Sequence, residues 1–221
     1  MKKFVYGMML SSAVVVGASA HEIWLELDSK KNEAKLFFGH FDVKEKESGE
    51  KFAKIKEGVA YPKDLLKEVK RNDDNITYTF SKATDVVVVR EDAPRKSRAE
   101  GITTKRISYS KAGVSSKESI AKFDIVPVDA SKNVFKLVFD NKGLEKIKVT
   151  AISPTGWTKT FLTNEKGEFT VETPWKGGYL LQTTFEDETK GEENGVAFDK
   201  TVHALSLNIT IEQGLPWEVK K

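Results

Sequence analysis

The amino-acid sequence predicts an all-β fold, a mainly antiparallel β-sandwich with a β-rich N-terminal part and one short helix. Three observations predict this class. Apolar and polar residues alternate over many short segments, these segments follow one another closely, and Gly, Asn or Pro residues separate them. Such residues supply the fixed or positive φ angles of tight turns. Short strands at this spacing are typical of antiparallel sandwiches.

Most of the chain after residue 75 consists of predicted strands. The segment 76–80 alternates strictly, and 86–89 is a run of valines. The other predicted strands lie at 102–109, 135–139, 147–151, 157–162, 169–171, 179–185 and 205–211. A helix is predicted only at 62–70, where proline occupies the first turn and Tyr61, Leu65 and Val69 recur at four-residue spacing.

Residues 1–20 have the three parts of a secretory signal peptide. Lys2 and Lys3 precede an apolar run at 4–16, and small residues end in an Ala-x-Ala pattern. The run is shorter than the roughly 20 residues that span a bilayer. We therefore expect cleavage before His21, export to the periplasm, and a mature chain that is not embedded in a membrane.

The mature chain is expected to divide near residue 120, into a β-rich region at 21–120 and a sandwich domain at 121–221. Without residues 1–20, the 36 Lys and Arg residues fall to 34, against 33 Asp and Glu residues. This balance gives no indication of nucleic-acid binding. Because the sequence has no cysteine, a metal site would need nitrogen and oxygen ligands.

Two of the three histidines fall at the ends of a predicted hairpin. Segments 21–28 and 34–40 both alternate, and a loop whose Asn32 can adopt a left-handed conformation connects them. If Asp28 lies opposite Glu33, His21 lies opposite His40. Directly opposed residues have Cβ atoms about 4.5–5.5 Å apart, which allows two imidazoles to share a metal ion.

The new N-terminus adds a further donor to this pair. A free α-amine and the imidazole of the same residue can chelate one ion, and an α-amine loses its proton more readily than a lysine does. We therefore expect His21 and His40 to be metal ligands. The other reading is two surface histidines that share no ligand.

A third ligand can come from His203 or from a carboxylate. His203 shares its parity with the apolar residues of the last predicted strand and should face inward, either as a core histidine or as a ligand. Four acidic residues follow His40 and form either an oxygen donor or a solvated surface: Asp42, Glu45, Glu47 and Glu50.

Several segments resemble the NikK-like periplasmic accessory proteins of nickel and cobalt transport. These are His-Glu-Ile-Trp-Leu-Glu at 21–26, Gly-His at 39–40, and the segments 156–159, 163–169 and 174–179. The resemblance implies an immunoglobulin- or transthyretin-like β-sandwich that binds nickel or cobalt for uptake. The leading His-x-x-Trp of the family corresponds to His21 and Trp24, and its Gly-His to Gly39 and His40.

We therefore expect a periplasmic binding protein, not an enzyme, that takes Ni²⁺ first and Co²⁺ or Cu²⁺ next. It would carry the ion, free or as a small chelate, to a membrane metal transporter. Nitrogen-rich ligation suits nickel and copper. Two alternatives stay open: a copper-dependent histidine-brace oxidoreductase or copper-trafficking protein, and a metal-free structural β module.

Overall fold

The computed structural model describes residues 21–97 and 101–216. The expected signal peptide at 1–20 lies outside the described residues. The architecture is all-β with mainly antiparallel sheets and one short α-helix, as the sequence predicted. Within the described part of the chain, no helix is long and apolar enough to span a membrane.

The N-terminal sheet is built around the predicted hairpin and has the order β1-β2-β6-β5, with β3 added to β2. Its strands are β1 (Glu22–Asp28), β2 (Glu33–His40), β3 (Glu45–Lys46), β5 (Leu66–Arg71) and β6 (Ile76–Phe80). Asp28 pairs with Glu33 and Ile23 pairs with Phe38, which confirms the predicted register. Asn32 has a φ of 56°, the left-handed conformation expected of it.

The central sheet has seven strands in the described residues, in the order β13-β12-β15-β18-β8-β7-β4. They are β4 (Val59–Tyr61), β7 (Val86–Lys96), β8 (Thr103–Ala112), β12 (Lys148–Ile152), β13 (Thr158–Leu162), β15 (Gly177–Asp187) and β18 (Lys200–Ile211). Strands β8 and β18 pair in parallel, whereas the other pairs are antiparallel. The expected boundary near residue 120 follows β8, and this parallel pair joins the two sides of it.

A smaller outer sheet lies over one face of the central sheet. It consists of β9 (Phe123–Asp129), β10 (Val134–Phe139), β11 (Lys142–Gly143) and β14 (Glu168–Thr170). A separate ribbon pairs β16 (Gly191–Glu193) with β17 (Val196–Phe198). The helical elements are α1 (Gly49–Ala53) and two 3-10 turns, η1 (Lys63–Leu65) and η2 (Ala130–Lys132).

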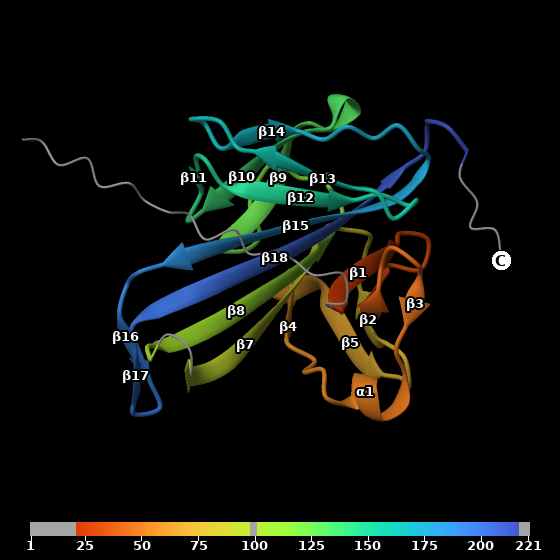
Figure 1. Cartoon of the computed structure of the whole chain (residues 1–221). Coiled ribbons are helices and arrows are strands. Elements are labelled where there is room, and N and C mark those ends of the chain that lie inside the picture. Colours follow the sequence, from red (N-terminus) through yellow and green to blue (C-terminus); the bar gives the residue numbers. More distant parts are fainter. Residues whose placement is uncertain (1–20, 98–100, 217–221) are drawn as a thin grey trace, which may run out of the picture.

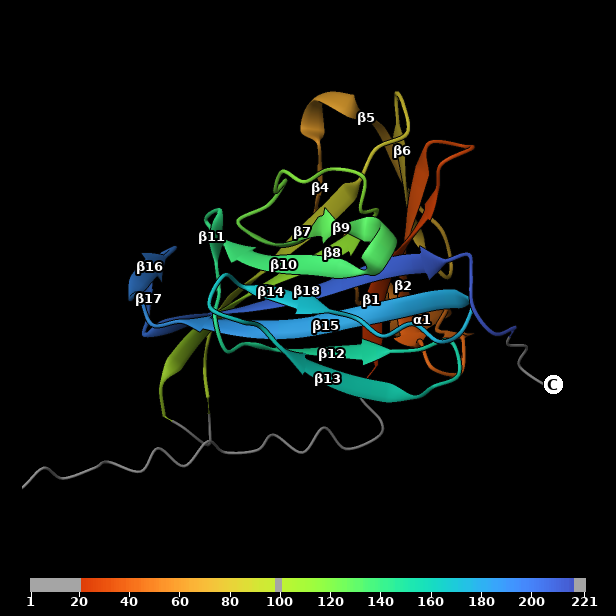
Figure 2. The same ribbon diagram turned by 90° about the horizontal axis from the view of Figure 1, so that it is seen from above.

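The three sheets form layers with the central sheet in the middle (Figures 1 and 2). One face of the central sheet packs against the outer sheet through a core that includes Leu205, Leu207 and Phe123. The opposite face packs against the N-terminal sheet, where Val88 contacts the cluster around Leu36. Successive residues of a strand point to opposite faces, so one strand of the central sheet contributes to both cores.

The prediction of a helix at 62–70 is wrong. The segment forms the short turn η1 and then the strand β5, which pairs with β6 along the edge of the N-terminal sheet. A four-residue spacing also fits an extended strand, in which residues i and i+4 share a face. Here Leu65 ends η1 and Val69 lies in β5, and the register between β5 and β6 shifts between Leu66 and Glu68. The short helix instead lies at α1, where Phe52 is buried.

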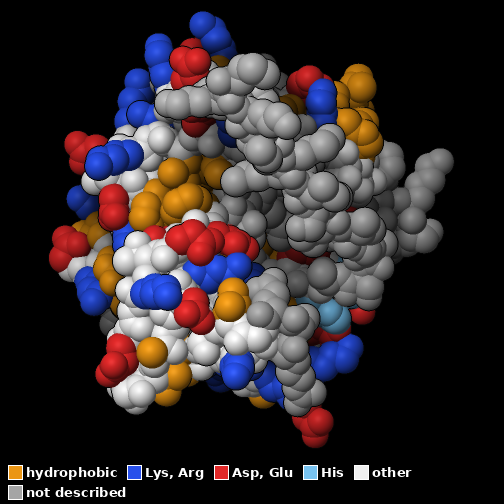
Figure 3. Space-filling model, turned by 60° about the vertical axis from the view of Figure 1, so that its left-hand side comes forward, with side chains coloured by type: hydrophobic (Ala, Val, Ile, Leu, Met, Phe, Trp, Pro, Cys, Tyr) orange, Lys and Arg blue, Asp and Glu red, His pale blue; other side chains and the backbone are white. Residues whose placement is uncertain are grey.

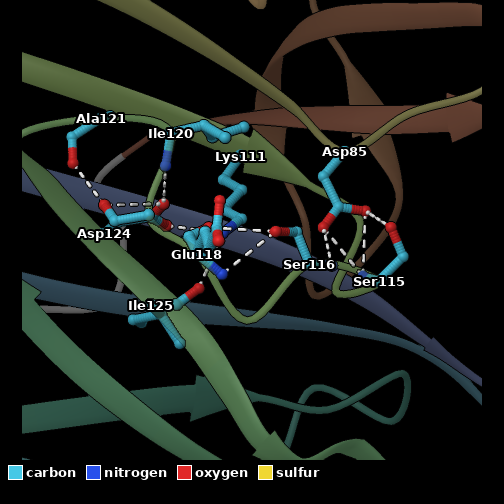
Figure 4. Close-up of polar contacts among 10 residues, drawn as sticks. Asp85, Lys111, Ser115, Ser116, Glu118, Ile120, Ala121, Asp124 and Ile125 are labelled. Atoms are coloured by element: carbon cyan, nitrogen blue, oxygen red, sulfur yellow. Dashed lines mark hydrogen bonds and ion pairs between the residues drawn. The ribbon is translucent and has the colours of Figure 1, made fainter.

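A buried ion pair joins the central sheet to the outer sheet (Figure 4). Lys111 Nζ lies 2.6 Å from Asp124 Oδ1 and 2.9 Å from the carbonyl oxygen of Ile125. The side chains of Lys111 and Asp124 are 1% and 0% exposed. Burial raises the pKa of Asp124, and the charge of Lys111 opposes this change. These contacts connect two layers of the fold and lie in the core.

The loop that connects these layers is held by a second buried acid, Asp85, which is also drawn in Figure 4. Its carboxylate accepts hydrogen bonds from the backbone N–H groups of Ser115 and Ser116 and from the Ser115 hydroxyl. The two acids together fix the chain between β8 and β9. They have structural partners and therefore do not form a candidate site.

Candidate metal centre

The structure brings His21 and His40 together at the open end of the β1–β2 hairpin. Their ring centroids are 4.4 Å apart, at an interplanar angle of 37°. His21 also stacks on Phe38, with centroids 4.6 Å apart. Because His21 directly precedes β1 and the register pairs Glu22 with Gly39, the ladder leads on to His21 opposite His40.

The turn after β2 brings an acid to this pair. Gly39 has a φ of +153°, and a Cβ at this position would overlap the backbone of Glu45 in β3. Glycine therefore allows β3 to fold back closely on β2. The N–H of Glu47 then donates to the carbonyl oxygen of Phe38 over 2.8 Å, which places the Glu47 side chain beside His21.

Glu47 is the acid of the 42–50 segment whose side chain lies within hydrogen-bond distance of His21, whereas Glu45 is the ladder partner of His40 on β3. Glu47 is 8% exposed, and its Oε1 lies 2.7 Å from His21 Nε2 and 2.7 Å from Lys51 Nζ. The hydrogen bonds from Lys51 and then from His21 lower the pKa of the Glu47 carboxyl. Sequence patterns do not distinguish Glu47 from three other acids, Asp42, Glu45 and Glu50, all of which are exposed in the structure.

A second acid fixes the backbone next to His40. Glu22 Oε2 accepts a hydrogen bond from the N–H of Phe41 over 3.1 Å. Burial raises the pKa of the Glu22 carboxyl, while the hydrogen bond from Phe41 lowers it. This hydrogen bond connects the start of β1 to the residue after His40. It therefore keeps the two strand ends that carry the imidazoles next to each other.

His203 lies on the opposite face of the central sheet from the pair. It is 1% exposed and packs among aromatic rings of the core: Tyr109, Phe123, Phe139 and Phe185. Ser206, three residues further along β18, points to the other face, where its hydroxyl donates to the carbonyl oxygen of Ile23 in β1. In contrast to the expected third ligand, His203 is therefore placed as a core histidine, because strand parity directs it away from the hairpin.

The aromatic surroundings change the chemistry of His203. Its Nδ1 lies 3.1 Å from the Tyr109 hydroxyl, and its buried Nε2 has no hydrogen-bond partner within the described residues. Burial, and to a lesser degree the charge of Lys122, lowers the pKa of His203 to about 4. A neutral imidazole at this position belongs to the packing of the sandwich.

The side chains alone do not complete a metal site. Within residues 21–97 and 101–216, no group of three or more His, Asp or Glu side chains is arranged to hold a metal ion. Figure 3 shows histidine at the surface beside acidic and basic side chains, and the burial of His203 assigns it to the His21–His40 pair. A site there would require a further donor.

Comparisons of the chain with protein-family models, with curated proteins and with solved structures find no match.

Proposed function

We propose that the mature protein is a periplasmic carrier of a divalent transition metal, nickel first and cobalt or copper next. The observation that supports it is the adjacency of the His21 and His40 imidazoles at the open end of the hairpin. In this proposal the carrier serves metal uptake and passes the ion to a membrane metal transporter. It requires cleavage before His21, which frees an α-amine next to the two rings.

The contacts of His21 indicate which of its atoms would bind the ion. Its Nε2 faces Glu47 at 2.7 Å, a hydrogen-bond distance that leaves no room for a metal between the two atoms. Nδ1, the ring nitrogen nearer the backbone, and the α-amine of the same residue would then chelate the ion. His40 would supply a third nitrogen, and such a donor set suits Ni²⁺ and Cu²⁺.

Glu47 would act as a positioning residue. A carboxylate that accepts the remaining N–H of a ligating imidazole fixes the tautomer and the orientation of the ring. Glu47 is itself held by Lys51. The histidine-brace oxidoreductase would need a flat aromatic binding face, whereas the sheet surface beside the pair carries mainly hydroxyl, amide and charged side chains. This composition favours a carrier.

We expect the protein that begins at His21 to bind Ni²⁺, and a version with Gly-Ser-Gly before His21 to bind it at least tenfold more weakly. The extension leaves both imidazoles in place but moves the amine away from them. Isothermal titration with Ni²⁺, Co²⁺, Cu²⁺ and Zn²⁺ measures the difference. Equal affinity of the two proteins would rule out the amine as a ligand.

The same titrations separate the proposal from its alternatives. Absence of binding tighter than about 100 µM, which corresponds to about −5.5 kcal/mol, would favour a metal-free structural module. Copper-dependent peroxide formation with ascorbate would favour the oxidoreductase. His40→Ala in the mature protein is expected to weaken Ni²⁺ binding as the extension does.

The Glu47→Gln variant is expected to bind Ni²⁺ about tenfold more weakly than the mature protein, in line with the usual effect of removing such a partner. Glutamine has nearly the same volume but no charge to hold the His21 N–H. Glu50→Gln is the matched control, because Glu50 is exposed on the same segment. Equal affinities of the two variants would remove the positioning role from Glu47.

A further inference from the structure

An open groove of about 1710 Å³ lies beside the histidine pair, on the part of the central sheet that the N-terminal sheet leaves uncovered. His21 and His40 line one part of it. The hairpin is anchored along the groove by Ser206, which donates to the carbonyl oxygen of Ile23, and by Asn208, which donates to that of Leu25.

The floor of the groove is a row of hydroxyl and amide side chains that crosses five strands. Cross-strand pairing aligns these residues in the order Thr160, Thr150, Gln182, Ser206 and Ser110. The Ser110 hydroxyl is buried, and within the described residues it has no hydrogen-bond partner. A buried polar atom without a partner is costly, so this one indicates a place for a polar ligand.

A second row of residues carries positive charge at the ends of the floor. Arg90 on β7 lies opposite Ser108 on β8, and Lys148 lines the groove from β12. The Nε atom of Arg90 is buried and, within the described residues, has no partner. Burial lowers the pKa of Arg90, and the nearby charge of Arg106 lowers it further. An anion between Arg90 and Arg106 would relieve both effects. Lys148 lies four strands away, about 19 Å across the sheet, so one small anion is assigned to the Arg90–Arg106 end.

The charge of the whole groove has the same sign. Six Lys and Arg residues line it, against three acidic ones. One of the acids, Asp92, already forms an ion pair with Lys56 over 3.1 Å. Another, Glu22, accepts from the backbone of Phe41. Guanidinium groups bind carboxylates in a two-point geometry, and hydroxyl rows bind the remaining oxygens.

We propose that this groove binds a small hydroxylated polycarboxylate, with its carboxylates at Arg90 and Arg106 and its hydroxyl oxygen on the adjacent serine side chains of β8, Ser108 and Ser110. The inference rests on the proposed function only at the end of the groove where the anion would contact the metal ion held by His21 and His40. The cargo would then be the metal together with its carboxylate chelator.

Citrate is a suitable probe. We expect the protein that begins at His21 to bind citrate in isothermal titration, and to bind it at least tenfold more tightly with Ni²⁺ present. Arg106→Gln should weaken citrate binding at least fivefold and leave the affinity for Ni²⁺ alone within twofold. Lys148→Gln, at the far end of the groove, should leave citrate binding within twofold. For Arg90→Gln, a thermal unfolding curve accompanies the citrate titration, because this side chain is partly buried and its replacement can change the stability of the fold.

Lys67→Gln and Lys70→Gln are the matched controls, since both residues are exposed on β5 and do not line the groove. Absence of citrate binding, or an equal loss of citrate affinity in the control variants, overturns the inference. If Ni²⁺ still binds in that case, the proposed metal carrier is unaffected. Citrate binding that depends on Arg106, without any Ni²⁺ binding, upholds the groove and removes the metal proposal.

Discussion

The Lys111→Met variant is expected to lower the free energy of unfolding by about 3–5 kcal/mol. Methionine fills the volume of the lysine stem but leaves the carboxylate of Asp124 buried without its counter-charge. Asp124 would keep the N–H of Ile120 at 3.1 Å and the Ser119 hydroxyl at 3.3 Å, both at the Oδ2 atom. Its Oδ1 atom would lose the contact with Lys111 Nζ.

Urea unfolding followed by circular dichroism measures this loss. Lys31→Met is the control, because Lys31 pairs with Asp28 over 3.7 Å at the surface, and exposed pairs contribute about 1 kcal/mol or less. The double variant Lys111→Met/Asp124→Leu should recover much of the stability, since it removes both charges together. A loss below about 1 kcal/mol in Lys111→Met would show that Asp124 is not left uncompensated.

The His203→Phe variant is expected to lose less stability than the wild type when the pH falls from 6.5 to 4. The pKa of His203 is about 4 in the folded protein, against 6.5 for an ordinary histidine. Below pH 6.5 the unfolded chain therefore binds a proton that the folded protein excludes, and the wild type loses stability until pH 4. The difference amounts to about 3 kcal/mol.

The comparison isolates His203 because other groups titrate in both proteins. Lys122 faces His203 and lowers its pKa, whereas Asp187, Asp140 and Glu91 oppose this effect. Urea unfolding at pH 7, 6, 5 and 4 gives the stability of each protein. The gap between wild type and His203→Phe should change by about 3 kcal/mol in favour of the variant over this range. Parallel curves would mean that the imidazole takes up its proton without unfolding.

The sequence was sufficient for the hairpin because its two strands leave one register that suits both faces. Leu25 lies opposite Leu36 on one face, and Glu26 opposite Lys35 and Trp24 opposite Phe37 on the other, so that both faces carry favourable pairs. A slip of one residue would break these pairs. At 62–70 the pattern was ambiguous. The four-residue spacing of Tyr61, Leu65 and Val69 fits a helix, but these residues lie in β4, η1 and β5. The pairing of β5 with β6 decides against the helix.

Local pattern determined the hairpin and many of the later strands, the turn at Asn32, the inward direction of His203 and the meeting of His21 with His40. These features depend on residues close in sequence or on strict two-residue alternation. The tertiary structure alone decided that His203 faces the outer sheet, that Glu47 folds over His21, and that Arg90 and Lys148 share a groove. Such relations join strands far apart in the chain, and layer packing, which no local pattern encodes, sets them.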